Sequence, residues 1–218
     1  MASFIYVADP MCSWCYGFGP ELAVLLNGLP DIPVRIVLGG LRVDNAKAMD
    51  EELKSTLLAH WKQVQGRTGL PFSPESLSRP NFVYNTEPAC RAVVAARMLA
   101  PQAAMAVFEA IQDAFYVRGQ DVTQGEVLAD IASAALKRAD VEIDAAAFLA
   151  NWNSEQARAA TQNDFTQIKQ WGILGFPTLV LEREGQLDLV TSGYAPATTL
   201  VAILQSLVDK GPSRTSSA

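Results

Sequence analysis

Two apolar runs near the start of the chain have the pattern of buried strands. Residues 4–8 are aromatic and β-branched and end at an Asp-Pro pair, and residues 34–38 form a second such run. Short runs of this kind, bounded by turn-forming residues, are typical of strands inside a core. Between them, leucines recur at helical spacing and Gly28 is the expected C-cap of a helix. We therefore predict a right-handed βαβ unit with two parallel strands.

From about residue 43 to residue 172, the apolar positions recur at helical spacing and strand signals are almost absent from the sequence. Five helices are expected in this passage, over residues 50–64, 87–99, 103–116, 123–136 and 145–171, the last broken near 151–153. Thr123 and Glu126 have the spacing of a capping box, which would fix the start of the fourth helix. The passage is therefore predicted to be all-helical.

The strand pattern returns towards the end of the chain. Residues 178–182 and 187–191 flank a polar turn and predict an antiparallel hairpin, which a helix over residues 196–208 follows. The outer segments then form a βαβ unit and a ββα unit that can share one sheet. The expected organisation is a discontinuous domain over 1–42 and 173–210, a helical insertion over 43–172, and a disordered polar tail over 211–218.

Composition and charge narrow the class of function. The chain has 218 residues, half of them hydrophobic, which is enough to bury a sizeable core. Its net charge of −6 comes from scattered acids, and no basic patch indicates nucleic-acid binding. No apolar run approaches the roughly 20 residues of a membrane span, and the N-terminus lacks the pattern of a secretion signal. We expect a cytoplasmic protein without membrane partners. In the reducing cytoplasm, paired cysteines are more often catalytic or metal-binding than structural.

The stretch DPMCSWCYGFGP places Cys12 and Cys15 three residues apart, between the first predicted strand and its helix. The first turn of a helix has unpaired N–H groups and a partial positive charge, which stabilise a thiolate. Thiolate is the form of cysteine that attacks a disulfide. We therefore expect Cys12 to be a nucleophile and Cys15, on the same face of the helix, to be the resolving thiol.

Zinc binding is the competing interpretation of the same pair. Four candidate ligands can be assembled, namely Cys12, Cys15, Cys90 and the one histidine, His60. Structural zinc sites mostly supply their ligands as two closely spaced pairs, and the sequence has no second pair, so the spacing favours redox chemistry. Cys90 is expected to be a packed core residue. Asp9 either relays a proton for Cys15 or opens the Asp-Pro turn.

A second stretch, WGILGFPT, precedes the predicted hairpin. Together with CSWC after the first strand and the helical insertion between them, it resembles the thioredoxin-fold DsbA family, and DPMCSWCYGF resembles its cytoplasmic FrnE-like branch. The resemblance implies an α/β thioredoxin fold with a large all-helical insertion between the βαβ and ββα halves. It also implies that Ser13 and Trp14 tune the redox potential. In the same family, Pro177 would be a cis-proline facing the cysteine pair, and Phe176 would pair through its backbone with a bound substrate.

We expect thiol–disulfide exchange that acts on proteins or small thiols containing a disulfide or a dithiol. The sequence leaves open whether the protein is a monomer or a homodimer. No metal or organic cofactor is expected, and glutathione is the candidate co-substrate. A glutathione-dependent transferase or isomerase of the kappa/2-hydroxychromene-2-carboxylate isomerase type is the alternative, because the asparagine-led helix start at residues 85–92 is similar to that of such relatives. A zinc-binding or redox-sensing interaction module is the second alternative. The Ser-Trp dipeptide leaves the direction of electron flow open.

Overall fold

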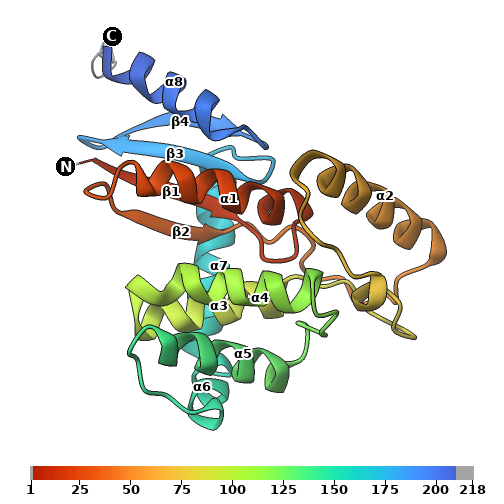
Figure 1. The fold of residues 1–218 in the computed structure, drawn as a ribbon. Helices are drawn as coiled ribbons and strands as arrows, with labels where there is room; N and C mark the ends of the chain where they lie inside the picture. The colour runs from red at the N-terminus through yellow and green to blue at the C-terminus, as the bar shows by residue number, and fades with distance from the viewer. Residues whose placement is uncertain (1, 210–218) are drawn as a thin grey trace.

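The computed structural model describes residues 2–209 and shows a four-stranded sheet with helices on both faces (Figure 1). The strands are β1 (Ala2–Ala8), β2 (Val34–Leu38), β3 (Thr178–Arg183) and β4 (Gln186–Ser192), in the spatial order β2-β1-β3-β4. β1 pairs with β2 in parallel and with β3 antiparallel, and β3 pairs antiparallel with β4. The βαβ and ββα units therefore share one sheet, which confirms the expected α/β architecture.

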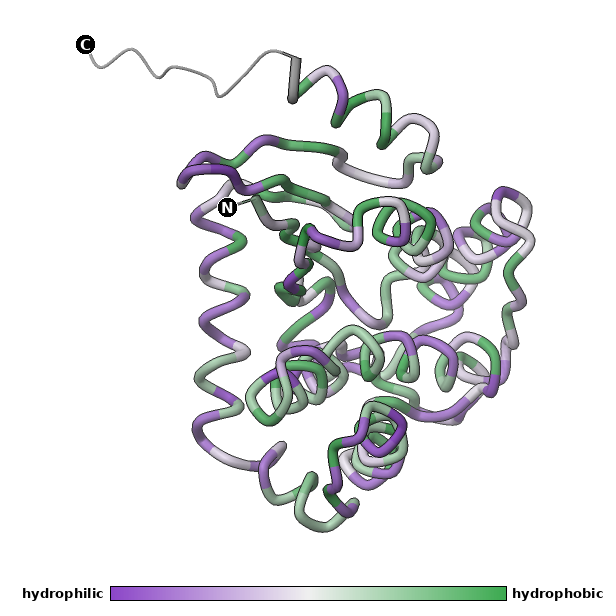
Figure 2. Tube along the Cα trace, turned by 60° about the vertical axis from the view of Figure 1, so that its left-hand side comes forward, coloured by the Kyte–Doolittle hydropathy of each residue, from purple (hydrophilic) through white to green (hydrophobic). Residues whose placement is uncertain are grey.

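Both faces of the sheet are covered, which explains why β1 has a continuous apolar sequence. Successive side chains of a strand point to opposite faces. Phe4 and Tyr6 accordingly join the larger buried cluster on one face, and Ile5 and Val7 join a smaller cluster on the other. The first face is covered by α1 (Ser13–Asn27) and α8 (Ala197–Asp209), and the second by α7 (Glu155–Gln170). Figure 2 shows that α7 is hydrophilic along most of its length, as expected for a helix that buries one narrow stripe.

The passage between β2 and β3 is helical, as predicted. Its other helices are α2 (Glu51–Thr68), α3 (Glu87–Leu99), α4 (Ala104–Tyr116), α5 (Gly125–Arg138) and α6 (Ala145–Trp152), with short 3₁₀ turns at Pro74–Leu77 and Pro101–Ala103. One buried cluster extends from the sheet into these helices. The domain boundaries after residue 42 and before residue 173 stay a prediction, and the tail over 211–218 lies outside the described residues. None of the described helices is long and apolar enough to cross a membrane.

The predicted break between α6 and α7 is confirmed, whereas the capping box of α5 is wrong. Ser154 caps α7, because its hydroxyl oxygen accepts a hydrogen bond from the Ala157 amide at 3.1 Å. Helix α5 instead begins after Gln124, whose side chain makes no cap hydrogen bond. The Thr123 hydroxyl donates to the Asp121 carboxylate at 2.6 Å, and this local bond takes the place of the predicted cap.

A buried ion pair fixes the insertion against the free edge of β2. Arg97 of α3 and Asp164 of α7 pair through two hydrogen bonds of 2.8 and 2.9 Å. Arg97 also donates to the Ile36 carbonyl oxygen at 2.6 Å, and Asp164 accepts from the Leu38 amide at 2.9 Å. The outer backbone groups of an edge strand are thus satisfied by side chains from two helices.

Candidate functional site

The two cysteines of the CSWC motif lie at the N-terminus of α1. Cys12 is the N-cap residue, its amide donates to the Asp9 carbonyl oxygen at 3.1 Å, and its carbonyl oxygen accepts from the Tyr16 amide at 3.1 Å. Cys12 keeps 6% of its surface exposed, whereas Cys15, one turn further along the helix, has 0%. Both are free thiols. The structure therefore gives the two thiols different access to solvent.

The burial of Cys15 has an electrostatic consequence. Burial raises the pKa of the Cys15 thiol well above its ordinary value, and the hydrogen bond and charge of Cys12 raise it further. The backbone amide of Asp9 acts in the opposite direction, because it donates to the thiolate form. Cys15 is therefore held as a protonated thiol at neutral pH.

The loop before β3 lies directly opposite Cys12. The Phe176–Pro177 peptide bond is cis, and the Cys12 thiol donates to the Phe176 carbonyl oxygen at 3.8 Å. The Pro177 carbonyl oxygen accepts from the Gly193 amide at 2.7 Å, which anchors the loop to the chain after β4. A Cβ atom on Gly39 would lie 2.3 Å from the Phe176 ring. The loop after β2 therefore lies closer to this ring than a residue with a side chain would permit. The structure thus brings together the two stretches that the sequence singled out.

The middle residues of the motif have different environments. Ser13 is the first residue of α1 and is half-buried. The half-buried Trp14 ring lies against Tyr194, with 5.8 Å between the ring centroids and an interplanar angle of 52°. The roles predicted for Ser13 and Trp14 in redox tuning, and for Phe176 and Pro177 in substrate binding, stay predictions.

A buried polar cluster behind the motif was not predicted as a unit. Asp9 is fully buried, and its carboxylate accepts from the Met11 amide at 2.8 Å and from the Leu41 amide at 2.7 Å. The Cys90 thiol donates to the same carboxylate at 3.4 Å. Burial raises the pKa of Asp9, against the lowering effect of the groups that donate to it, Thr86 among them. Cys90 is buried as expected, but it also has this polar partner.

Two buried tyrosines hold the backbone of the motif in place. The Tyr84 hydroxyl donates to the Met11 carbonyl oxygen, and the Tyr6 hydroxyl donates to the Cys15 carbonyl oxygen at 3.4 Å. Burial raises the pKa of both hydroxyls well above their ordinary value, so both remain donors at neutral pH. The position of the thiols is therefore set by side chains from β1 and from the segment before α3.

The four candidate zinc ligands do not form one site. Within residues 2–209, no group of three or more histidine, cysteine, aspartate or glutamate side chains is arranged to hold a metal ion. His60 is exposed on α2, whereas Cys90 is buried against Asp9. The structure therefore does not bring the candidate ligands together.

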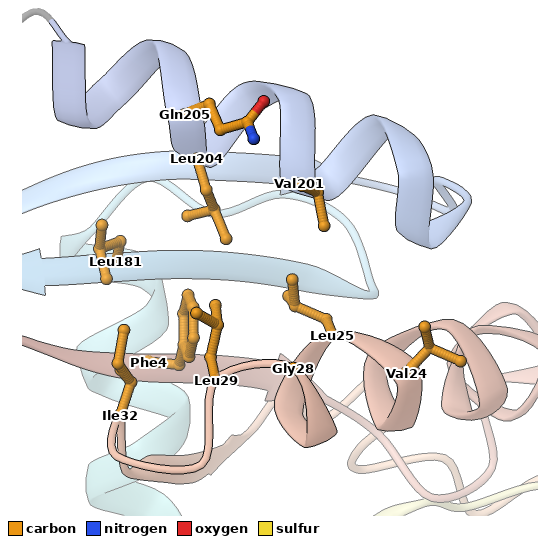
Figure 3. A pocket seen from close by; sticks show the side chains of 10 residues that line it. All are labelled: Phe4, Val24, Leu25, Gly28, Leu29, Ile32, Leu181, Val201, Leu204 and Gln205. Atoms are coloured by element: carbon orange, nitrogen blue, oxygen red, sulfur yellow. The ribbon is translucent and has the colours of Figure 1, made fainter.

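An apolar cavity of about 590 Å³ lies away from the thiols, between α1 and α8 (Figure 3). Its lining residues are Phe4, Val24, Leu25, Gly28, Leu29, Ile32, Leu181, Val201, Leu204 and Gln205. Gln205 is the one polar side chain in this lining, and no residue of the CSWC motif contributes to it. The cavity has neither a nucleophile nor a titratable group, so we do not include it in the candidate site.

A cysteine pair at the start of the helix after a parallel strand, facing a cis-proline loop, defines a thioredoxin-like fold. The model of the DSBA-like thioredoxin domain family matches residues 5–205, and the chain belongs to this family. The resemblance to the DsbA family is thereby confirmed, and the solved structures reported next are consistent with its FrnE-like branch.

Solved structures and curated proteins similar to this chain were also found. A putative protein disulfide isomerase from Nitrosomonas europaea is 33% identical, with a TM-score of 0.85 over 97% of this chain and 99% of that chain. The cytosolic disulfide reductase DsbM from Pseudomonas aeruginosa is 28% identical, with a TM-score of 0.76 over 96% and 100% of the two chains. The ClpXP adapter protein SpxH from Shouchella clausii (strain KSM-K16) is 24% identical over 204 residues, which are 92% of this chain. The match spans 65% of the length of that relative.

Proposed function

We propose that this chain is a thiol–disulfide oxidoreductase in which Cys12 attacks the substrate and Cys15 resolves the mixed disulfide. The observation that carries the proposal is the asymmetry of the pair. Cys12 lies at a helix N-terminus opposite the Phe176 carbonyl group and keeps 6% of its surface exposed, whereas Cys15 is fully buried. An attacking thiol must reach solvent, and a resolving thiol needs only to reach the first sulfur.

The reaction follows from these positions. The Cys12 thiolate attacks one sulfur of the substrate disulfide, the S–S bond breaks, and the leaving thiolate takes up a proton. Cys15 then loses its proton and attacks the Cys12 sulfur of the mixed disulfide, and the second substrate thiol leaves. The substrate disulfide gains two electrons, and the protein is left with a Cys12–Cys15 disulfide. The reverse sequence would oxidise a dithiol.

We further propose that the chain works as a reductase in the cytoplasm, with glutathione as the co-substrate that returns Cys12–Cys15 to the dithiol. Support comes from the cytosolic disulfide reductase DsbM, of which a structure with GSH is 27% identical, with a TM-score of 0.74. Two glutathione molecules supply the two electrons and leave as glutathione disulfide. The exchange of sulfur bonds needs no metal or organic cofactor.

Trapping the mixed disulfide tests the mechanism. The variant Cys15→Ala, Cys90→Ala leaves Cys12 as the one thiol of the chain, because the sequence has three cysteines. Mixed with glutathione disulfide, it is expected to accumulate one glutathione adduct on Cys12, detected by mass and peptide mapping. The matched variant Cys12→Ala, Cys90→Ala is expected to remain unmodified, because Cys15 is buried. Absence of the adduct on Cys12 would reject the exchange mechanism.

A third variant, which lacks both cysteines of the motif, addresses the isomerase alternative. A transferase or isomerase would keep saturable glutathione binding and activity in the variant Cys12→Ala, Cys15→Ala. The proposed oxidoreductase is expected to lose all disulfide reduction in that variant, because both reacting sulfurs are absent.

A further inference from the structure

The rim of the candidate site carries a positioned arginine that the exchange mechanism does not use. Arg67, in the last turn of α2, lies over the Tyr194 ring, with 5.6 Å between its Cζ atom and the ring centroid. Tyr194 in turn contacts Trp14, one of the two residues between the cysteines. Two ring contacts, each shorter than 6 Å, therefore connect the guanidinium group with the CSWC motif.

The acidic side chain that contacts Tyr194 is Glu21, and both of its carboxylate oxygens already accept hydrogen bonds. One carboxylate oxygen of Glu21 accepts from the Tyr194 hydroxyl at 3.0 Å, and the other accepts from the Ala197 amide at 2.7 Å, at the start of α8. In the described part of the chain, the ion pairs within 4.0 Å do not include Arg67. Arg67 is exposed on the same rim. Its charge is therefore held in place by an aromatic ring and is available to an anion from solvent.

We propose that Arg67 binds a carboxylate of the disulfide substrate while Cys12 attacks its sulfur, so that the preferred substrates are small acidic disulfides, for which glutathione disulfide serves as the probe. This inference rests on the proposed exchange reaction at Cys12. The chain as a whole has a net charge of −6 and repels anions, so a localised cation connected to the motif through Tyr194 and Trp14 would select for them. The carboxylates of a tripeptide disulfide lie within about two to three residue lengths of the sulfur, roughly 7–10 Å.

Single-turnover kinetics with two disulfides test this role. The pre-reduced protein, freed of glutathione, is mixed with one disulfide and formation of the Cys12–Cys15 disulfide is followed, so that the two thiols of the protein supply the two electrons. Glutathione disulfide is anionic, and bis(2-hydroxyethyl) disulfide is uncharged and has no carboxylate. Arg67→Ala is expected to lower the second-order rate constant for reaction with glutathione disulfide about tenfold, the effect of losing one charge-assisted hydrogen bond. The kinetics with the uncharged disulfide are expected to stay within about twofold, because the reacting sulfurs and the thiols are untouched.

Two further variants separate recognition from folding. Arg67→Lys keeps the charge but loses the planar fork, so it is expected to recover part of the rate constant for glutathione disulfide that Arg67→Ala loses. Lys62→Gln removes an exposed charge of the same helix outside the Tyr194 contact and is expected to leave both substrates unaffected. An equal loss of activity with both disulfides in Arg67→Ala, or no change with either, would overturn the proposal. If the unaltered protein reduces neither disulfide, the proposed exchange function itself fails, and the role of Arg67 fails with it.

Discussion

The Cys90 thiol donates a hydrogen bond to the buried carboxylate of Asp9, with 3.4 Å between Sγ and Oδ2. This contact joins α3 to the turn that precedes the CSWC motif, across 81 positions of sequence. The same carboxylate accepts from the amides of Met11 and Leu41, so it also joins the two loops that surround Cys12. Asp9 therefore connects the helical passage with the reactive end of the sheet.

Asp9→Asn is expected to destabilise the protein by about 1–3 kcal/mol. The asparagine amide group has one acceptor and one donor end, so it leaves a buried backbone N–H of Met11 or Leu41 facing another donor. Urea unfolding of the variant and the unaltered protein measures the difference in the free energy of unfolding. Cys90→Ser, which keeps a donor to Asp9, is the matched control and is expected to lose less stability. An unchanged unfolding midpoint in Asp9→Asn would show that the cluster contributes nothing.

Stability is expected to fall as the pH rises above about 9. Burial raises the pKa of Cys15, Cys90 and Tyr84 well above their ordinary values, so the folded protein keeps protons that the unfolded chain loses. When the folded state binds more protons, the free energy of unfolding decreases with pH, by up to about 1.4 kcal/mol per pH unit for each group.

Urea unfolding across this alkaline range measures that slope. Cys90→Ala removes one of the three contributing groups. The free energy of unfolding is then expected to fall less steeply with pH, by at most about 1.4 kcal/mol per pH unit. Stability that is constant or increases between neutral pH and about pH 10 would contradict the burial of these protonated groups.

Gly17→Ala is expected to destabilise the protein by about 1–3 kcal/mol, although alanine favours helices. A Cβ atom at this position of α1 would lie 2.6 Å from the Cγ1 atom of Val64, which is buried on α2 and stiff because it is β-branched. In a Val64→Ala background, the clash is absent, and the same substitution is expected to be neutral or to stabilise by up to about 1 kcal/mol. A double-mutant cycle by chemical unfolding tests the change of sign, and additive effects would argue against this close helix contact.

The elements that the sequence predicted well have strong local signals. β1 and β3 are continuous apolar runs because both faces of the sheet are covered, and the break between α6 and α7 has its own capping residue, Ser154. Cys12 and Cys15 could be placed at a helix start because a strand, a turn and a helical pattern follow one another there. The cap of α5 was mispredicted because Asp121 competes for the Thr123 hydroxyl, and spacing alone does not rank two local acceptors.

The rest of the site depends on contacts between distant segments. Cys90 and Asp9 come from different elements, and nothing in the sequence around Cys90 indicates a polar partner. Trp14, Tyr194 and Arg67 come from α1, the segment before α8, and α2, and only folding places them on one rim. For the cluster around Asp9, the one sequence signal was the Asp-Pro pair before the motif, and that pair indicated a turn.

The redox equilibrium of the cysteine pair tests the central claim most directly. The protein and its Cys90→Ala variant are equilibrated in glutathione buffers of graded potential, and free thiols are counted by the mass shift after alkylation. The account predicts a single two-electron transition for Cys12 and Cys15 within the glutathione range, roughly −180 to −270 mV, that Cys90→Ala leaves in place. If both thiols remain open to alkylation in the most oxidising buffer, the pair forms no disulfide and the proposed oxidoreductase is contradicted.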